Sequence, residues 1–271
     1  MNVLEEIIAN KRREIETPGY FQALEKVLET LPHVGTDCTT CDGKPARHPV
    51  PDFIAALKAA PMGLIAEVKR KSPSAGPIRE PFDPAAIARA YEAAGAQAIS
   101  SLMDAKYFGG GEAQWNAVRA ATGLPMLYKE FVIDPRQIFH AEALGAAAVL
   151  LIVAALDDVE LKKYIRLIEA SGMTPLVEVH TEEEMRRAIS AGAECIGINN
   201  RNLKTLETKL ETTLQLRKLA PKDCTLISES GIRTADDVKI LRNTGIAAIL
   251  VGESLLRQPD IETAVHSLMR S

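Results

Sequence analysis

The sequence predicts an α/β protein, a (β/α)8 TIM barrel with an N-terminal helical extension, on three observations. Short apolar runs rich in β-branched residues recur from about residue 61 onward, with starts roughly 20–33 residues apart, the length of a strand with its following helix. Each run leads through a turn into a segment rich in Ala, Leu, Glu and Arg. Eight such units favour closure into a barrel, and a chain of 271 residues suits a fold that takes roughly 250.

The predicted strands are apolar throughout, as expected of parallel strands that are covered on both faces. Such strands need helices on one side and a packed interior on the other. In chain order the runs are GLIAEVK from Gly63, AQAISSLM from Ala96, PMLYKEFV from Pro125, AAAVLLIV from Ala146, TPLVEV from Thr174, ECIGINN from Glu194, CTLISES from Cys224 and IAAILVG from Ile246.

Helix signals separate these strands. Asp83 and Asp134 each stand as an N-cap before a proline at the first helical position. Four glycines end a helix and turn the chain toward the next strand: Gly95, Gly145, Gly192 and Gly245. A doubly wound dinucleotide-binding sheet is disfavoured, because no G-x-G-x-x-G follows the first strand.

The first 60 residues do not fit the repeat. They predict a helix over about residues 3–16, a second over about 20–30 and an irregular stretch to about residue 50. We therefore expect a single barrel domain over residues 1–271, with residues 1–60 as an N-terminal helical extension.

Composition narrows the classes of partner. The formal charge of −4 disfavours a general nucleic-acid or anionic-membrane surface. No apolar run approaches the roughly 20 residues of a membrane span, and the first residues lack the order of a signal peptide. Cys195 and Cys224 lie in apolar runs, as buried free thiols do in a reducing compartment. We expect a cytoplasmic protein, a monomer or weak homodimer, that acts on a small molecule.

Polar residues end most of the apolar runs, where a TIM barrel carries its chemistry. Alone, a strand-end Lys or Glu is more often solvated or ion-paired than catalytic. A ring of such residues at one end of an apolar barrel costs free energy unless it binds something. The ring consists of Glu67 and Lys69, Lys129 and Glu130, Glu178, Asn199 to Arg201, and Glu229 to Gly231.

The last two strands carry a phosphate-binding signal. Ser230 and Gly231 follow the seventh strand, and Gly252 and Glu253 follow the eighth. Small residues allow backbone N–H groups to approach a phosphate, and a short helix beginning near Glu253 would direct its positive end at it. The alternative is that Gly252 only serves a tight turn.

Eight segments follow one another along the chain: AEVKRKSPSAG, DAKYFGGG, YKEFVIDP, LLIVAAL, PLVEVH, GINNRNL, SESGI and VGESLL. In this order they resemble the motifs of indole-3-glycerol phosphate synthases, and the resemblance covers about residues 1–271 and is weakest between about residues 31 and 60. The resemblance implies a lyase of tryptophan biosynthesis without metal or cofactor. It would close the ring of a carboxyphenylamino-deoxyribulose phosphate with loss of carbon dioxide and water.

The resemblance also implies catalytic roles. Lys129 would be the general acid and Glu178 the acid–base partner in the dehydration. Lys69 would contact the phosphate and share in proton transfer, while Glu67 and Glu229 would orient the lysines and substrate hydroxyls. Burial lowers a lysine pKa whereas nearby carboxylates raise it, and both effects apply to Lys129.

Binding roles follow from the same resemblance. Asn199 and Arg201 would contact the anthranilate part of the substrate. Ser230, Gly231, Gly252 and Glu253 would hold the phosphate, the last two through backbone N–H groups. Ser72 lies in a Pro/Gly-rich loop, RKSPSAGPIREP, that is typical of a mobile lid.

The chain departs from the family pattern at two strand ends. Ser101-Leu102-Met103 stands where the family usually has Val-Leu-Thr, and Tyr128-Lys129-Glu130 replaces an Arg-Lys-Asp type of run. Either a tolerant region has drifted, or the protein is a paralogue with a changed aromatic pocket. A non-catalytic phosphate-binding barrel is disfavoured by the intact lysine and glutamate pair. Phosphoribosylanthranilate isomerase would need a catalytic Cys and Asp at the ends of the first and sixth strands, which end otherwise here.

Four further residues offer an alternative metal site. His33, Cys38, Cys41 and His48 would supply four zinc ligands, but their spacing is not a standard one, so free thiols or a surface disulfide are favoured. His140 and His180 fall within or at the start of helices and are expected to be surface or capping residues.

Overall fold

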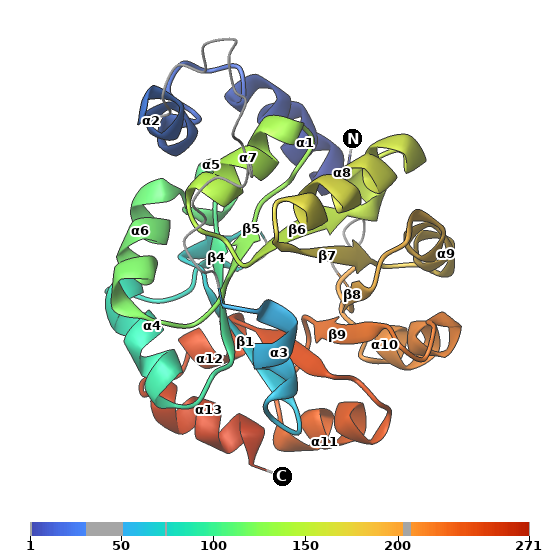
Figure 1. Cartoon of the computed structure of the whole chain (residues 1–271). Helices are drawn as coiled ribbons and strands as arrows, with labels where there is room; N and C mark the ends of the chain where they lie inside the picture. Colours follow the sequence, from blue (N-terminus) through green and yellow to red (C-terminus); the bar gives the residue numbers. More distant parts are fainter. Residues whose placement is uncertain (1, 31–50, 74, 203–206, 271) are drawn as a thin grey trace, which may run out of the picture.

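The computed structural model describes residues 2–30, 51–73, 75–202 and 207–270. Its centre is a closed barrel of parallel strands in the order β1-β10-β9-β8-β7-β6-β5-β4, as the repeat predicts (Figure 1). The strands are β1 (Gly63–Val68), β4 (Ala98–Leu102), β5 (Met126–Lys129), β6 (Ala148–Ile152), β7 (Thr174–Val179), β8 (Cys195–Asn199), β9 (Thr225–Glu229) and β10 (Ala248–Val251). A small antiparallel hairpin, β2 (Lys71–Ser72) with β3 (Gly76–Pro77), follows β1.

Helices surround the barrel (Figure 1). The main ones are α4 (Pro84–Ala93), α6 (Glu112–Ala121), α7 (Pro135–Ala143), α8 (Asp158–Ala170), α9 (Glu182–Ala191), α10 (Glu211–Leu216), α11 (Ala235–Asn243) and α13 (Ile261–Met269). Short helical turns lie in the connections: α5 (Ala105–Phe108), η1 (Val153–Ala155), η2 (Arg217–Leu219) and α12 (Glu253–Leu256). Within the described residues, no helix is long and apolar enough to cross a membrane.

The predicted helix boundaries are present. Asp83 and Asp134 cap α4 and α7, with their side chains accepting from backbone N–H groups of the first turn. Gly95, Gly145, Gly192 and Gly245 all have positive φ, between 71° and 92°, which glycine adopts without strain. These glycines therefore turn each helix back toward the barrel.

Two apolar layers result from the alternation of side chains along each strand. Leu64, Ala66 and Val68 of β1 point outward into the core that the strands share with the helices. Ile65 of the same strand joins a second cluster that fills the barrel interior. The next two inward positions are Glu67 of β1 and Lys69 directly after it, so the apolar interior gives way to charged groups at one end.

The opposite end of the barrel is closed by a helix that the sequence pattern did not predict. This helix, α3 (Phe53–Lys58), lies just before β1 and is capped by Asp52. Phe53 and Leu57 are fully buried in the interior cluster. The six residues are too few to show a helical period, so no helix was predicted between the irregular stretch and the first strand.

The first helices, α1 (Val3–Glu14) and α2 (Gln22–Thr30), agree with the predicted extension. Lys11 of α1 is almost fully buried, and its Nζ lies 3.0 Å from Glu130 Oε2 and 3.2 Å from Asp104 Oδ2. The Tyr20 hydroxyl donates to the same Glu130 oxygen at 3.1 Å. An isolated charge would not tolerate such burial, so these ion pairs fix α1 to the ends of β4 and β5.

Candidate active site

A cavity of about 550 Å³ opens at the carboxyl ends of the barrel strands. Its size is in the usual range for a small-molecule site. Most of the residues predicted from the sequence line it: Glu67, Lys69, Lys129, Glu178, Asn199, Arg201, Glu229, Ser230, Gly231, Gly252 and Glu253. Ser72 does not, because it is buried in the β2–β3 hairpin, where its hydroxyl accepts from the backbone N–H of Ala75 at 3.2 Å.

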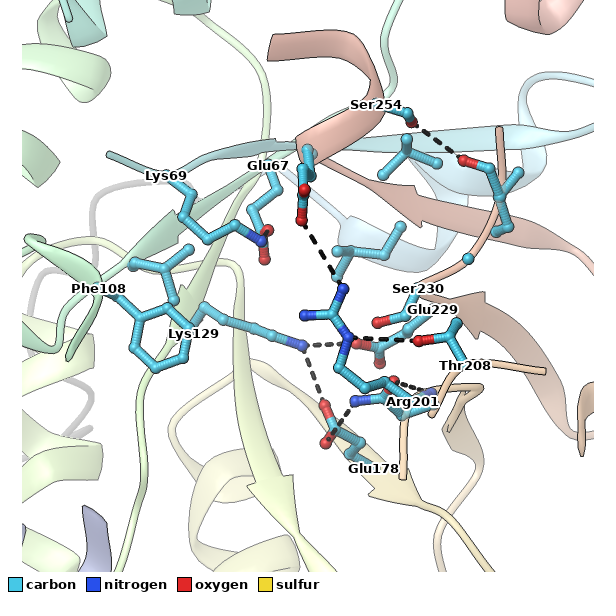
Figure 2. A pocket seen from close by; sticks show the side chains of 18 of the residues that line it. Glu67, Lys69, Phe108, Lys129, Glu178, Arg201, Thr208, Glu229, Ser230 and Ser254 are labelled. Carbon is cyan, nitrogen blue, oxygen red and sulfur yellow. Dashed lines mark hydrogen bonds and ion pairs between the residues drawn. The ribbon is translucent and has the colours of Figure 1, made fainter. Parts of the chain in front are cut away.

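Lys129 lies at the centre of this ring (Figure 2). Its Nζ donates to Glu178 Oε2 at 3.1 Å and to Glu229 Oε2 at 2.5 Å. Burial lowers the pKa of Lys129, but Glu229 and Glu178 outweigh that effect, so the pKa is raised above its ordinary value. Of the two opposing effects expected from the sequence, the carboxylates prevail, and Lys129 is a stable cation.

The two carboxyl groups on Lys129 differ in proton affinity. Burial raises the pKa of Glu229, and the attraction of Lys129 offsets this only in part, so the pKa is about 7. Burial acts on Glu178 in the same direction, but Lys129 and then His180 reverse it and hold the pKa of Glu178 well below its ordinary value. Carboxyl groups whose pKa values are pushed apart serve as acid and base partners in enzymes.

Glycines make room for the inward carboxylates. Glu67 pairs with Lys69 on the same strand face. A Cβ on Gly252 would lie 2.6 Å from Glu67 Oε1, and a Cβ on Gly197 would overlap Glu229 Oε1. Neither position tolerates a side chain without movement of a charged group, so both glycines have a packing role in addition to any turn.

The rim beside β9 and β10 is basic and tightly turned. Ser230 has φ 64° and Gly231 has φ 77°, so both adopt the left-handed region. Glu253 lies between two arginines, 3.8 Å from Arg201 Nη2 and 3.0 Å from Arg257 Nε. Figure 2 shows the Arg201 side chain reaching across from the end of β8 toward α12. Arg257 lines the same cavity although the sequence reasoning did not select it.

Three of the residues at which the chain departs from the family pattern, Ser101, Met103 and Tyr128, face away from the cavity, whereas the fourth, Glu130, lines it. Tyr128 is fully buried against Trp115, with its hydroxyl 3.0 Å from His140 Nδ1. The Ser101 hydroxyl accepts from Gln114 at 3.2 Å, and Met103 belongs to the outer core. A change of substrate pocket through these three side chains is therefore not supported.

Sequence reasoning overlooked the aromatic wall of the cavity. Phe108 and Phe131 line it beside Lys129, with ring centroids 6.0 Å apart. Both lie in segments that resemble the family, DAKYFGGG and YKEFVIDP, but no spacing rule distinguishes them from core residues.

The expectation for the two helix-associated histidines was wrong for His140 and incomplete for His180. His140 is buried, with its Nε2 2.7 Å from Glu112 Oε1. His180 lies next to the site, with its Nε2 3.3 Å from Glu178 Oε1. The helical period alone does not show that His140 of α7 is buried, or that His180 between β7 and α9 reaches Glu178.

Among the residues that the structure describes, no group of His, Cys, Asp and Glu side chains is arranged to hold a metal ion. The four-residue set of His33, Cys38, Cys41 and His48 lies outside those residues. Cys195 and Cys224 are free thiols, the first buried and the second partly so, and burial raises the pKa of both, to about 11 in Cys224.

Fold and site together define a TIM-barrel enzyme whose strand ends hold a lysine between carboxyl groups. The profile of the indole-3-glycerol phosphate synthase family matches residues 4–268. The chain is 49% identical to the indole-3-glycerol phosphate synthase of Roseiflexus sp. (strain RS-1), over 82% of this chain and 86% of that protein. It is 45% identical to the one of Roseiflexus castenholzii, over 98% and 97%. The chain belongs to the indole-3-glycerol phosphate synthase family, a family of carboxy-lyases.

Solved structures agree on the fold. The N-acetylmannosamine-6-phosphate 2-epimerase from Clostridium perfringens superposes with a TM-score of 0.60 over 79% of this chain and 95% of that one, at 18% identity. The 3-hexulose-6-phosphate synthase superposes with the same score over 76% and 98%, at 13% identity. At identities this low, the similarity shows only that the barrel architecture is shared.

Proposed function

We propose that this protein converts 1-(2-carboxyphenylamino)-1-deoxyribulose 5-phosphate to indole-3-glycerol phosphate in tryptophan biosynthesis. Family membership over nearly the whole chain supports the activity. The observation that carries the residue roles is the position of Lys129, held at 2.5 Å from Glu229 and 3.1 Å from Glu178 at the cavity's centre.

Ring closure needs an acid at the ketone oxygen while the aromatic ring attacks the ketone carbon. Lys129 takes this role, since its ammonium points between the strand ends and its raised pKa keeps it charged. A fixed cation also stabilises the developing oxyanion. The carboxyl group of the ring leaves as carbon dioxide, which restores aromaticity.

Dehydration then needs a base to accept a proton and an acid to protonate the departing hydroxyl. Glu178 is the base, because its low pKa keeps it ionised, and Asn199 orients it by donating to Oε1 at 3.2 Å. Glu229 is protonated in part near neutral pH, because burial raises its pKa to about 7. Glu67 orients Lys69, which contacts the phosphate and shares in proton transfer.

The substrate's ends are assigned by the chemistry of the rim. The phosphate lies against Ser230, Gly231, Gly252 and Glu253, with backbone N–H groups as donors. Arg201 contacts the anthranilate carboxylate from the end of β8. Ser72 contributes only when the hairpin after β1 rearranges over the bound substrate.

One assay tests the proposed activity, and a second tests the role of Lys129 as the general acid. The protein is incubated with the carboxyphenylamino-deoxyribulose phosphate, and indole fluorescence is followed; absence of product at high enzyme concentration contradicts the proposal. Lys129→Met lowers kcat by a factor of about 100 or more and leaves binding of a substrate analogue largely intact. Turnover close to that of the parent protein would reassign the acid.

We further infer the organisation around this activity. The chain forms one domain over residues 1–271, with residues 1–60 as an extension of the barrel. The protein is a cytoplasmic monomer or weak homodimer that acts on a small sugar phosphate and not on nucleic acid, consistent with its charge of −4. Sedimentation of the purified protein across a range of concentrations tests the assembly.

A further inference from the structure

His180 lies between two carboxylates at the edge of the site. It follows Glu178 by two positions, so both side chains share a face at the end of β7. Its Nε2 lies 3.3 Å from Glu178 Oε1, and its Nδ1 lies 3.1 Å from Glu184 Oε2 on α9. Its side chain is 8% exposed. The ring therefore bridges the proposed base and the first turn of the next helix.

Helix capping does not account for the position of this ring. The cap of α9 is formed by the Thr181 hydroxyl, which accepts from Glu184 N at 3.2 Å. Glu184 in turn accepts the backbone N–H of His180 at 2.6 Å. These contacts need the backbone of His180 and not its imidazole. The imidazole adds two contacts of its own, from Nδ1 to Glu184 and from Nε2 to Glu178, and only the second reaches the site.

The contact to Glu178 pairs the imidazole with a carboxylate oxygen at 3.3 Å. Nε2 of His180 is buried and lacks a hydrogen bond of good geometry, although it is within ion-pair distance of Oε1. Asn199 donates to that same oxygen, and Lys129 occupies the other oxygen, Oε2. Glu178 is thereby held by groups from three directions, with His180 on the side away from Lys129.

We propose that His180 is a positioning residue for the acid–base reaction, an imidazolium that keeps the Glu178 carboxylate ionised and oriented toward Lys129. The inference rests on the proposed role of Glu178. Lys129 from β5 is shared with Glu229 of β9, which has the shorter contact. A second cation on Glu178 compensates for that sharing.

The charges around the ring favour its protonated form. Glu178 of β7 and Glu184 of α9 face the imidazole directly, while Lys129 and Glu229 lie beyond Glu178. Burial lowers the pKa of His180, but the two carboxylates outweigh burial and raise it to about 10. Because this folded-state pKa is raised, the interaction is present throughout neutral pH and is lost as pH rises toward 10.

The direct test is an NMR titration of the histidine rings in the full-length protein, with the His180 signal assigned by its absence in His180→Gln. We expect His180 to remain protonated to about pH 9, and Glu178→Gln to lower its pKa by more than one unit. A His180 pKa near the ordinary value of about 6.5, or one that Glu178→Gln does not change, overturns the inference.

Kinetics provide the second test. His180→Gln lowers kcat by about tenfold, part of what loss of an acid–base group costs, with little change in KM. The acidic limb of its kcat profile moves to higher pH, because Glu178 is then protonated more easily. His266→Gln is the matched control, since His266 is exposed on α13 and leaves both parameters unchanged.

The two proposals fail in distinguishable ways. If Glu178→Gln keeps full turnover, the proposed role of Glu178 is wrong whatever His180 does. If Glu178→Gln loses turnover while His180→Gln keeps the parent kcat and pH profile, only the positioning role is wrong. Circular dichroism melts of each variant separate loss of fold from loss of function.

Discussion

Gly197 of β8 lies directly against the carboxyl group of Glu229 on β9, so that a methyl group at residue 197 would overlap Glu229 Oε1. That oxygen is buried and has no hydrogen-bond partner among the described residues. The absence of a side chain at residue 197 thus determines where the second carboxylate on Lys129 can lie.

Gly197→Ala should displace Glu229 and lengthen its contact with Lys129. Misplacement of a catalytic group by about 1 Å costs on the order of 100-fold in rate, so we expect kcat to fall by about that factor. Stopped-flow or steady-state indole fluorescence measures the change. Gly123→Ala is the control, because the nearest atom to its added Cβ is the Glu92 side chain at 3.6 Å. Equal kcat values for Gly197→Ala and Gly123→Ala would mean that Glu229 moves aside without loss of activity.

The raised pKa of Glu229 makes stability depend on pH in a definite direction. The folded protein keeps the Glu229 proton up to about pH 7, whereas the unfolded chain loses it near 4.5. The folded state therefore binds more protons between these values, and this group's contribution to the free energy of unfolding decreases as pH rises through them. Glu178 acts oppositely and only below about pH 4.5, since its pKa is lowered.

Urea unfolding of the parent protein and of Glu229→Gln at pH 5 and pH 7.5 checks this sign. The parent should lose more stability over that interval than the variant does. An identical pH dependence for the two proteins would show that Glu229 is ionised throughout.

Lys11→Met should destabilise the protein by about 3–5 kcal/mol, because it leaves Asp104 and Glu130 buried without their cation. The double change Lys11→Met with Glu130→Gln should recover part of that loss. Arg186→Met is the surface control, since Arg186 and Glu182 form an exposed pair worth at most about 1 kcal/mol. Chemical denaturation at one pH measures all three, and a loss in Lys11→Met as small as in the control would contradict the role of the buried ion pairs.

Glu253→Gln should strengthen binding of the phosphorylated substrate. The change removes the carboxylate that Arg201 and Arg257 share, which leaves more positive charge at the rim. We expect KM to fall severalfold at low ionic strength and the difference to shrink in about 0.5 M salt, where charges more than a few ångströms apart are screened. Arg257→Gln should raise KM instead. No change in either variant would place the phosphate elsewhere.

The barrel was predictable because its signals are local and repeated. Gly95, Gly145, Gly192 and Gly245 have positive φ and end helices at places where the sequence already shows the step into a strand. The site followed from the strand ends, since side chains of parallel strands meet there. Period-two alternation would also have shown that Tyr128 faces outward once its neighbour Lys129 faces inward.

Other features depend on contacts between distant segments. The burial of Lys11 and Glu130 joins residues 119 positions apart, and neither segment alone indicates a partner. The six residues of α3 gain their helix from packing beneath the barrel and not from a local pattern. His180 belongs to the site only because Glu178 and Glu184 converge on it, which requires knowledge of where β7 meets α9.

Within the described residues, the helix beneath the barrel blocks the end opposite the cavity, which leaves one opening between the strand ends. With Phe53 and Leu57 filling one end, whatever enters between the strand ends must leave by the same opening. A product molecule that is still bound therefore excludes the next substrate molecule, so the two compete for the same site. Inhibition by product should accordingly be competitive with the substrate.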